Sequence, residues 1–295
     1  MRLQDITSSG VATRIGLFLG RYMPRRMGYA LARYIACIIA DCRPAIYHTV
    51  RANLQQVVGP GVREEALHEM TRQVFYHAGQ CYYDFFHAVG QPPEKRGSMI
   101  DIPESFVEHV RAEAARGRGV LLLGIHMSNF DLIFPALGAR GLPVQVLSLA
   151  DPGPGFRIFN RLRGVGALRI TPISPESLRQ AIKLLKSGGI VATGVDRPVP
   201  QDRELIEFFG RPALMPLGPA RLAVMTGAAT FVGGCYHTPG KGYALQYTGP
   251  LGFARTGDRN QDILTAARAI AAIVENYIRA RPEQWMMFHP VWPEH

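Results

Sequence analysis

The chain has 295 residues, of which 47% are hydrophobic, and a formal net charge of +10 at neutral pH. This length allows one large domain or two modest ones, and the apolar content excludes a disordered chain because a sizeable core can be buried. The excess of positive charge says nothing about the fold. It favours anionic partners, such as a membrane surface, a nucleic acid or an anionic substrate.

The first forty residues mix basic and apolar side chains. Pro24 and Gly28 predict two short helices rather than one continuous helix. One interpretation is a helical arm that lies in the interface of an anionic bilayer, with its arginines reaching the headgroups. The alternative is a helical hairpin packed on the rest of the domain. The longest apolar stretch of the arm, residues 28–40, is broken by Arg33 and is shorter than the roughly 20 residues of a membrane-spanning helix. We therefore expect no spanning helix, and the polar first ten residues predict no cleavable signal peptide.

A helical pattern follows over residues 64–89, where apolar residues recur at steps of three and four. Pro and Gly residues between 90 and 97 end it. We therefore place an N-terminal helical, membrane-associating region at residues 1–97 and a core at residues 98–295, together forming one structural domain.

From residue 102 onward, strand and helix patterns alternate. This alternation predicts an α/β fold with a largely parallel central sheet flanked by helices. A hairpin-like pair near Val232 and Leu245 predicts additional antiparallel strands. The expected strands include residues 119–125, 144–150, 167–171 and 190–195, and the expected helices include residues 105–116, 175–187, 217–226 and 261–281.

The four cysteines show no Cys-x-x-Cys pair and no zinc-like spacing with histidine, so we expect reduced thiols and a reducing compartment. They are Cys37, Cys42, Cys81 and Cys235.

His126 follows the apolar run at residues 119–125, which has the pattern of a strand buried on both faces. The carboxyl edge of such a sheet is where ligands bind in open α/β folds. Ser128 and Asp131 also fit a capping box at the start of a helix, which would explain Asp131 without any catalytic task. If a tight turn brings Asp131 to the imidazole, the carboxylate would fix the tautomer and leave the other nitrogen to take a proton from a hydroxyl.

No covalent nucleophile accompanies this pair in the sequence. A Gly-x-Ser-x-Gly elbow, a His-Glu-x-x-His zinc helix and a P-loop are all missing. A base without a nucleophile favours activation of the substrate's own hydroxyl and direct transfer between two bound substrates.

The motif His-x4-Asp after a buried strand resembles the signature of the glycerolipid acyltransferases. The surrounding sequence looks like the lipid A acyltransferase family, which includes lauroyl and myristoyl acyltransferases and the acyltransferases of phosphatidylinositol mannosides. That family shows H-x-G-N-W-[DE], where this chain has HMSNFD from His126 to Asp131. Further similar stretches follow in family order: RANL (51–54), FNRLRGVG (159–166), VDRP (195–198), FFGRPALMPLGPARLAVMTGA (208–228) and RPEQWMMFHPVW (281–292).

The chain departs from the family pattern in two places. Asp196 and Arg197 stand where family members usually have an aspartate-glutamine pair, and the N-terminus is amphipathic where relatives have a transmembrane segment. Arg197 also resembles the arginine of the Glu-Gly-Thr-Arg motif of glycerol-3-phosphate acyltransferases. Because of these differences, the resemblance does not specify which lipid accepts the acyl group.

By resemblance, His126 is the general base and Asp131 its orienting partner, while Ser128 and Asn129 lie in the substrate-binding part of the motif. Arg161 and Arg197 are expected to clamp a phosphate or headgroup, since guanidinium forks suit phosphate oxygens. The alternative is that both are surface arginines paired with acids. For Asp196, the expectation is that it orients Arg197 or bonds an acceptor hydroxyl.

Pro216 and Gly218 precede an apolar helix whose N–H groups could bind an oxyanion or phosphate, or could simply form a turn. Apolar residues near the site could line an acyl groove, although plain core is the more ordinary interpretation. They are Leu132, Phe134, Phe208 and Phe209. His289 and Trp292 are treated as structural.

The resemblance implies an O-acyltransferase at the cytoplasmic face of the inner membrane. Its co-substrate would be acyl-CoA or an acyl carrier protein thioester, without metal or other cofactor, and its acceptor a membrane lipid. The rival interpretations are a lysophospholipid or glycerol-phosphate acyltransferase, a non-catalytic lipid-binding protein and a nucleic-acid-binding protein. The last is disfavoured because no nucleic-acid-binding motif is present, and a binding module has no need for a base.

Overall fold

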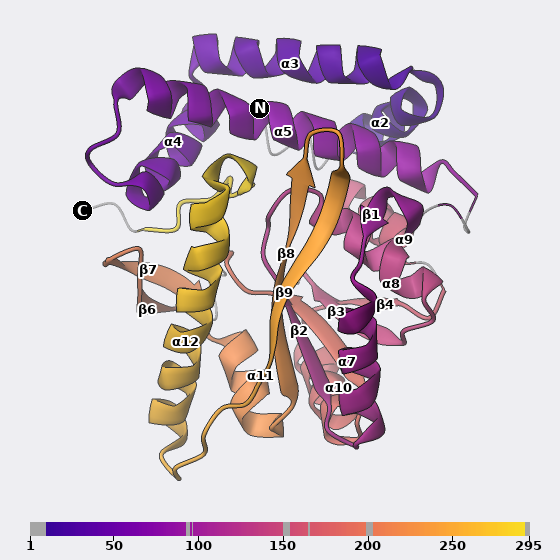
Figure 1. Ribbon diagram of the computed structural model, residues 1–295, viewed down its shortest axis with the longest axis vertical. Helices are drawn as coiled ribbons and strands as arrows, with labels where there is room; N and C mark the ends of the chain where they lie inside the picture. Colours follow the sequence, from indigo (N-terminus) through magenta and orange to yellow (C-terminus); the bar gives the residue numbers. More distant parts are fainter. Residues whose placement is uncertain are drawn as a thin grey trace.

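The computed structural model describes residues 10–92, 95, 97–149, 154–164, 166–198 and 203–292. A seven-stranded sheet in the order β1-β9-β8-β2-β5-β3-β4 forms its centre (Figure 1). All neighbouring strands pair in parallel except β8 and β9, which form an antiparallel hairpin. The strands are β1 (Ile100–Asp101), β2 (Val120–Gly124), β3 (Val144–Ser148), β4 (Arg169–Pro172), β5 (Ile190–Gly194), β8 (Ala229–Thr238) and β9 (Gly242–Leu251). The predicted largely parallel α/β sheet is therefore confirmed.

Helices cover both faces of this sheet (Figure 1). They are α7 (Glu104–Ala115), α8 (Ile133–Ala139), α9 (Pro154–Arg163), α10 (Pro175–Lys186), α11 (Gly218–Thr226) and α12 (Arg259–Ala280), with the short 3-10 helices η1 (Gly97–Met99), η2 (Phe130–Leu132) and η3 (Pro282–Gln284). A separate antiparallel pair, β6 (Arg203–Phe208) and β7 (Arg211–Pro216), packs beside α12.

The central strand β2 is buried on both faces. Leu121 and Leu123 belong to the core beneath α10, α11 and α12, whereas Val120 and Leu122 belong to the core beneath α7 and α8. Successive side chains of a strand point to opposite faces, so a strand between two cores must be apolar at every position. This explains why residues 119–125 form an unbroken apolar run.

In the described part of the chain, the helices α2 (Gly10–Tyr22), α3 (Arg25–Cys42), α4 (Ala45–Val58) and α5 (Glu64–Val89) precede the sheet. The break between α2 and α3 falls at Pro24, as predicted. Figure 1 shows α3 and α5 crossing the upper end of the molecule. The two helices pack closely because a Cβ at Gly79 of α5 would lie only 2.8 Å from the Cβ of Ala32 of α3. In the part of the chain that the structure describes, no helix is long and apolar enough to cross a membrane.

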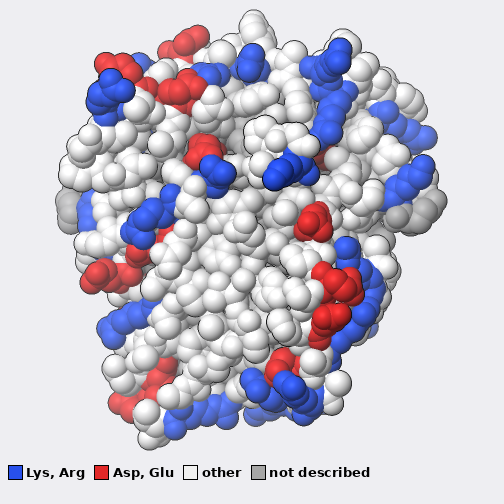
Figure 2. All heavy atoms as spheres, in the orientation of Figure 1, with Lys and Arg blue, Asp and Glu red and all other residues white. Residues whose placement is uncertain are grey.

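The outer face of α2 and α3 carries a row of exposed apolar side chains, which we call the apolar stripe. Phe18, Tyr22 and Tyr34 are each more than 60% exposed. The stripe consists of Val11, Ile15, Phe18 and Tyr22 on α2, and Met27, Leu31, Tyr34, Ile35 and Ile38 on α3. Their steps of three, four and seven residues put them on one side of each helix. Figure 2 shows Lys and Arg side chains, together with Asp and Glu side chains, among uncharged surface along the upper edge of the molecule, where α3 lies.

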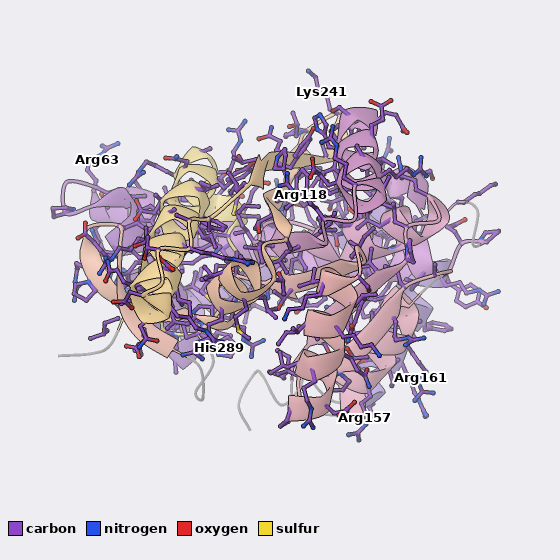
Figure 3. The ribbon with its side chains drawn as sticks, turned by 90° about the horizontal axis from the view of Figure 1, so that it is seen from below. Arg63, Arg118, Arg157, Arg161, Lys241 and His289 are labelled. Atoms are coloured by element: carbon purple, nitrogen blue, oxygen red, sulfur yellow. The ribbon has the colours of Figure 1, made fainter. Side chains whose placement is uncertain are left out.

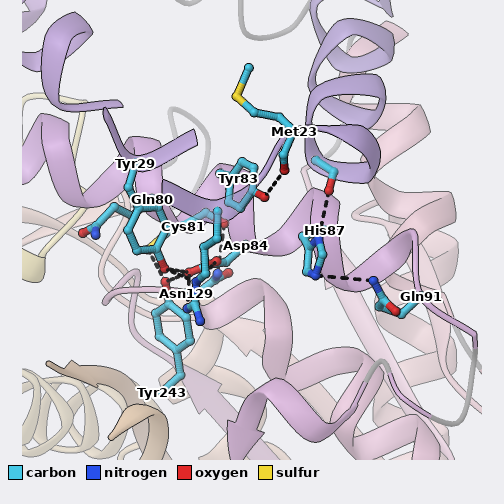
Figure 4. Close-up of polar contacts among 12 residues, drawn as sticks. Met23, Tyr29, Gln80, Cys81, Tyr83, Asp84, His87, Gln91, Asn129 and Tyr243 are labelled. Carbon is cyan, nitrogen blue, oxygen red and sulfur yellow. Dashed lines mark hydrogen bonds and ion pairs between the residues drawn. The ribbon is translucent and has the colours of Figure 1, made fainter. Parts of the chain in front are cut away.

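Helix α5 joins these N-terminal helices to the sheet through buried polar groups (Figure 4). The carboxylate of Asp84 accepts hydrogen bonds from Tyr29 of α3 at 2.7 Å and from Tyr243 of β9 at 2.6 Å, and pairs with Arg25. The Tyr83 hydroxyl donates to the Met23 carbonyl at 2.6 Å. One polar cluster therefore ties α3, α5 and the sheet together.

Candidate active site

His126 lies directly after β2, at the carboxyl edge of the sheet. Its backbone N–H and its ring Nδ1 both bond the carboxylate of Asp196, with Nδ1 only 2.6 Å from Oδ1. Asp196 follows β5, the parallel neighbour of β2, and the two strands are in register with Gly124 opposite Gly194. Because parallel strands end at the same edge, residues 70 apart in sequence meet here.

Asp196 is fully buried and has a third donor, since the indole N–H of Trp285 reaches its Oδ2 at 2.8 Å. Burial alone would raise the pKa of Asp196, but the interactions with His126 and Trp285 outweigh burial and hold that pKa below its usual range. The carboxylate is therefore ionised at neutral pH. The orienting position on the imidazole, which the sequence assigned to Asp131, is occupied by Asp196.

The imidazole of His126 has room because β5 ends in glycine. A Cβ at Gly194 would lie 3.1 Å from Cε1 of His126, closer than ordinary contact. The ring of Phe130 packs edge-on against the imidazole at 5.0 Å between centroids. The side chain of His126 remains 24% exposed, and because Asp196 occupies Nδ1, Nε2 is the ring nitrogen left for an incoming group.

Asp131 takes a different partner. One of its carboxylate oxygens lies 2.5 Å from the guanidinium of Arg163 at the end of α9. Arg163 in turn lies over the rings of Phe130, Phe134 and Phe159. Burial raises the pKa of Asp131, and the pairing with Arg163 opposes that rise only in part. Asp131 and Arg163 thus form a buried pair that fixes α9 against the loop after His126.

The loop from His126 to Asp131 is held from above by α5. Ser128 has a left-handed backbone with φ of 48°, which explains why the family pattern has glycine there. Its hydroxyl bonds Nε2 of His77 at 2.9 Å, and the amide of Asn129 donates to the carbonyl of Cys81 at 2.9 Å. Ser128 and Asn129 are both buried. The prediction that Ser128 caps a helix with Asp131 is wrong, because η2 begins without a side-chain cap and the Ser128 hydroxyl bonds His77. The side chains of Ser128 and Asn129 anchor the loop, and their role in substrate binding stays a prediction.

Electrostatic interactions connect three further side chains with His126, Asp196 or Asp131. Arg197 follows Asp196, and burial lowers its pKa although Asp196 opposes the effect. His289 of the C-terminal tail interacts electrostatically with Arg197 and His126, and burial together with these neighbours lowers its pKa to about 4. It is therefore neutral at pH 7. Tyr82 of α5 lies near enough to Arg197 and Asp131 to interact electrostatically with both.

No sequence pattern predicted a place in the site for Arg163, Tyr82, Trp285 or His289. The tail motif contained Trp285 and His289, but only the folded chain shows that it returns to the end of β5. Met286 N–H donates to the His126 carbonyl at 2.9 Å, which fixes this return.

Arg161 is not part of the group around His126. It lies on the outer side of α9, in a hollow that it shares with Arg157 and with Arg14 of α2. Figure 3 shows Arg157 and Arg161 pointing outward on the same side of the molecule as His289.

The remaining candidates are buried or partly buried. Pro216 and Gly218, at the start of α11, are partly buried, and α11 packs against α10 and α12. The proposed acyl-groove residues Leu132, Phe208 and Phe209 are buried core residues, and Phe134 is partly buried. Within the described ranges, no cluster of three or more His, Cys, Asp or Glu side chains could hold a metal ion.

A largely parallel α/β sheet with a His-x4-Asp motif at its carboxyl edge is typical of the glycerolipid acyltransferase class. Comparison with known sequences narrows this class. The bacterial lipid A biosynthesis acyltransferase family matches residues 6–294, so the chain belongs to this family and is an O-acyltransferase.

Two groups of relatives are similar over much of the chain. Phosphatidylinositol mannoside acyltransferase of Mycobacterium tuberculosis (strain CDC 1551 / Oshkosh) is 25% identical over 82% of this chain and 76% of its own length. The enzyme of that name from Mycolicibacterium smegmatis is 24% identical over 98% and 92%. The lipid A biosynthesis lauroyltransferase of Escherichia coli is 30% identical over 62% of this chain and 59% of its own length.

Proposed function

We propose that this acyltransferase moves a fatty acyl group from an acyl thioester directly to a hydroxyl of a membrane glycolipid or phospholipid, with His126 as the general base. The donor is acyl-CoA or an acyl carrier protein thioester. No acyl-enzyme forms in this reaction: the acyl group passes directly from the thioester to the hydroxyl, and His126 carries the proton.

The observation that carries this proposal is the contact between Nδ1 of His126 and the buried Asp196 at 2.6 Å. A carboxylate on Nδ1 fixes a proton there and leaves the Nε2 lone pair to accept one. Nε2 takes the hydroxyl proton as the hydroxyl oxygen attacks the thioester carbonyl. The tetrahedral intermediate then collapses, the carbon–sulfur bond breaks, and the imidazolium returns its proton to the departing thiolate.

Asp196 supports this cycle electrostatically. It remains ionised near neutral pH because its pKa is held below the usual range, so it stabilises the imidazolium that forms when His126 is protonated. Trp285 keeps the second carboxylate oxygen from rotating away.

The acceptor is proposed to reach the site from a membrane surface. The apolar stripe offers bulky exposed side chains with arginines beside them, which suits the interface of an anionic bilayer. We propose that the protein docks by this stripe at the cytoplasmic face of the inner membrane. Relatives named for phosphatidylinositol mannosides and for lipid A make a glycolipid acceptor the first to test.

The test is acyl transfer from labelled acyl-CoA and acyl carrier protein thioesters to a panel of glycolipids and lysophospholipids. His126→Ala should lower the rate by about 10²–10⁴, the usual contribution of a positioned base. His48→Ala, an exposed histidine on α4, is the matched control and should keep the wild-type rate. Near-wild-type transfer by folded His126→Ala would contradict the proposed mechanism.

A further inference from the structure

A hollow lies where α3, α5, η3 and the tip of the β8–β9 hairpin meet. We call it the polar pocket. Its wall is drawn from residues 25–29 of α3, 73–80 of α5, 239–242 at the hairpin tip and 283–284 of η3. Its volume is about 640 Å³, and sites for small molecules typically have volumes of about 300–1,000 Å³. The polar pocket is therefore large enough for a small molecule.

Nearly all the side chains that line the polar pocket are polar. They include three glutamine amides, two tyrosine hydroxyls and two imidazoles, together with Arg25, Arg26 and Glu283. Among the described residues of the wall, Pro239 has the only purely apolar side chain. A fatty acyl chain would leave these polar groups without water or hydrogen-bond partners. The ligand of this pocket is therefore polar.

Most of these groups can both donate and accept hydrogen bonds. Burial lowers the pKa of His77 to about 4 and also lowers the pKa of His237, so both imidazoles are neutral at pH 7. A neutral imidazole, an amide and a phenol each offer a donor and an acceptor. Hydroxyl groups also do both, whereas phosphate oxygens only accept. The wall therefore matches a ligand rich in hydroxyl groups better than it matches a phosphate.

The charges of the wall are nearly balanced. Arg25 pairs with the buried Asp84 at 3.3 Å. Arg26 and Glu283 have opposite formal charges, and neither has a hydrogen-bond or ion-pair partner in the described part of the chain. A guanidinium and a carboxylate can each bond two neighbouring hydroxyls. Such pairs of hydroxyls occur on the ring of a sugar.

The wall also holds the loop after His126. The hydroxyl of Ser128 bonds Nε2 of His77 at 2.9 Å, and the backbone N–H of Ser128 donates to the carbonyl of Gln284 at 2.8 Å. His77 and Gln284 both line the polar pocket. A ligand that restrains these two residues therefore also restrains the loop.

The polar pocket and the catalytic group face different sides of the molecule. Lys241 stands at the hairpin tip between the lining residues Gly240 and Gly242, and His289 interacts electrostatically with His126. Figure 3 shows Lys241 and His289 on opposite sides of the molecule. His126 itself does not line the pocket. A ligand bound here is thus separate from the hydroxyl that His126 deprotonates.

We propose that the polar pocket binds a single sugar unit, either free or attached to a lipid, and that the bound sugar stabilises the loop after His126. This inference goes beyond the proposed function, because the sugar is a second ligand and is not the acyl acceptor. The amides, phenols and imidazoles of the wall bond its hydroxyls. His77 and Gln284 transmit its binding to Ser128.

The direct test measures binding of methyl α-glucopyranoside, methyl α-galactopyranoside and sorbitol to the full chain by calorimetry. Gln73→Ala should weaken binding about fivefold, the loss expected for one hydrogen bond. Gln180→Ala is the matched control, because Gln73 and Gln180 each bond the glutamate four residues earlier on a helix, and only Gln73 lines the pocket. It should change binding less than twofold. Tyr76→Phe, which removes one hydroxyl from the wall, should also weaken binding.

Hydrogen exchange tests the connection to the loop. Saturating sugar should slow exchange of the amides of residues 127–132 in the wild type and in Gln180→Ala, and inorganic phosphate should not displace the sugar. The proposal is overturned if none of the three probes binds, if the two glutamine variants weaken binding equally, if phosphate displaces the sugar, or if the loop exchanges at the same rate with and without it.

Octyl α-glucopyranoside, used below its micelle concentration, identifies the source of the sugar. Binding about tenfold tighter than that of the methyl glycoside, with the same dependence on Gln73, would identify a lipid-linked sugar, because the added chain buries apolar surface. Equal affinities would identify a free sugar. None of these measurements requires acyl transfer. An inactive protein that binds the sugar would overturn the proposed function alone, whereas an active one that does not would overturn only the polar pocket.

Discussion

Two buried aspartates lie near the same histidine, and they are used differently. Asp196 contacts the His126 imidazole and receives three hydrogen-bond donors, and its pKa is lowered. Asp131 pairs with Arg163, and its pKa is raised because burial exceeds the effect of the arginine. A carboxylate five residues from a histidine is thus less closely coupled to it than one seventy residues away.

The comparison shows that the two ends of the motif His-x4-Asp are held by different partners. Asp196 fixes the ring of His126, and Arg163 links Asp131 to α9. We therefore expect substitution of the two residues to have separable consequences.

The largest effect should come from Asp196→Asn. An amide cannot hold the Nδ1 proton as a carboxylate does, and it presents an N–H to the ring in one of its orientations, so the rate of acyl transfer should fall by about 10²–10³. In proton NMR, the downfield Nδ1–H signal of His126 should move or disappear. A variant that keeps both the rate and this signal would show that Asp196 is not the orienting group.

Asp131→Asn should act less strongly on the rate. The side chain of Arg163 is only 11% exposed and would lose its charged partner, but the pKa of Asp131 is raised because burial opposes its charge more than Arg163 favours it, so the free energy of unfolding at neutral pH should change by less than about 1 kcal/mol. The rate should fall only about tenfold, and the His126 Nδ1–H signal should persist. Denaturant unfolding of the two aspartate variants side by side provides the measurement. Loss of that signal in Asp131→Asn would contradict the division of roles.

Gly194→Ala tests whether the ring position matters when both carboxylates are kept. The added methyl would lie 3.1 Å from His126 Cε1 and should displace the imidazole by a few tenths of an ångström. We expect about a tenfold loss of kcat, with a melting temperature close to that of the wild type. Gly124→Ala, opposite Gly194 on β2, is a suitable control because a Cβ there would meet only one oxygen, at 3.9 Å. Equal losses of kcat in the two variants would show that crowding of the His126 imidazole is not the cause.

The smallest effect is a difference in pH dependence. The pKa of Asp196 is lowered on folding, so its stabilising contribution is present above the unfolded pKa and is lost as the pH falls through the folded value. The pKa of Asp131 is raised, so the folded state gains stability from it as the pH falls. The difference in free energy of unfolding between wild type and Asp196→Asn should shrink below about pH 4. Relative to Asp131→Asn, in contrast, the wild type should gain stability as the pH falls. Parallel pH curves for the two variants would show that the carboxylates are equivalent after all.

Much of the fold follows from local patterns. The uniform apolar run at residues 119–125 predicts a strand between two cores, and Pro24 predicts the break between the first two helices. His126 could be placed at the carboxyl edge because it follows that strand directly. These features depend on neighbouring residues only, so the sequence pattern is sufficient.

The site could be predicted only in part. The contact between His126 and Asp196 depends on β2 and β5 being neighbours in register, which no periodicity reveals. The contributions of Trp285 and His289 depend on the tail returning over the sheet edge. The capping box at Ser128 failed for a tertiary reason, because the buried His77 takes the hydroxyl that a helix end would otherwise use.

Helix α5 contacts both the N-terminal helices and the loop after His126. Its Tyr83 and Asp84 hold the region around Met23 and Tyr29, and its His77 and Cys81 hold the loop after His126. All these bonds are made by one rigid helix. Separation of the N-terminal helices from α5 and release of the loop should therefore occur in the same cooperative transition. In hydrogen exchange, the amides of α5 should therefore be among the slowest in the chain, and the loop should begin to exchange only when α3 separates from α5.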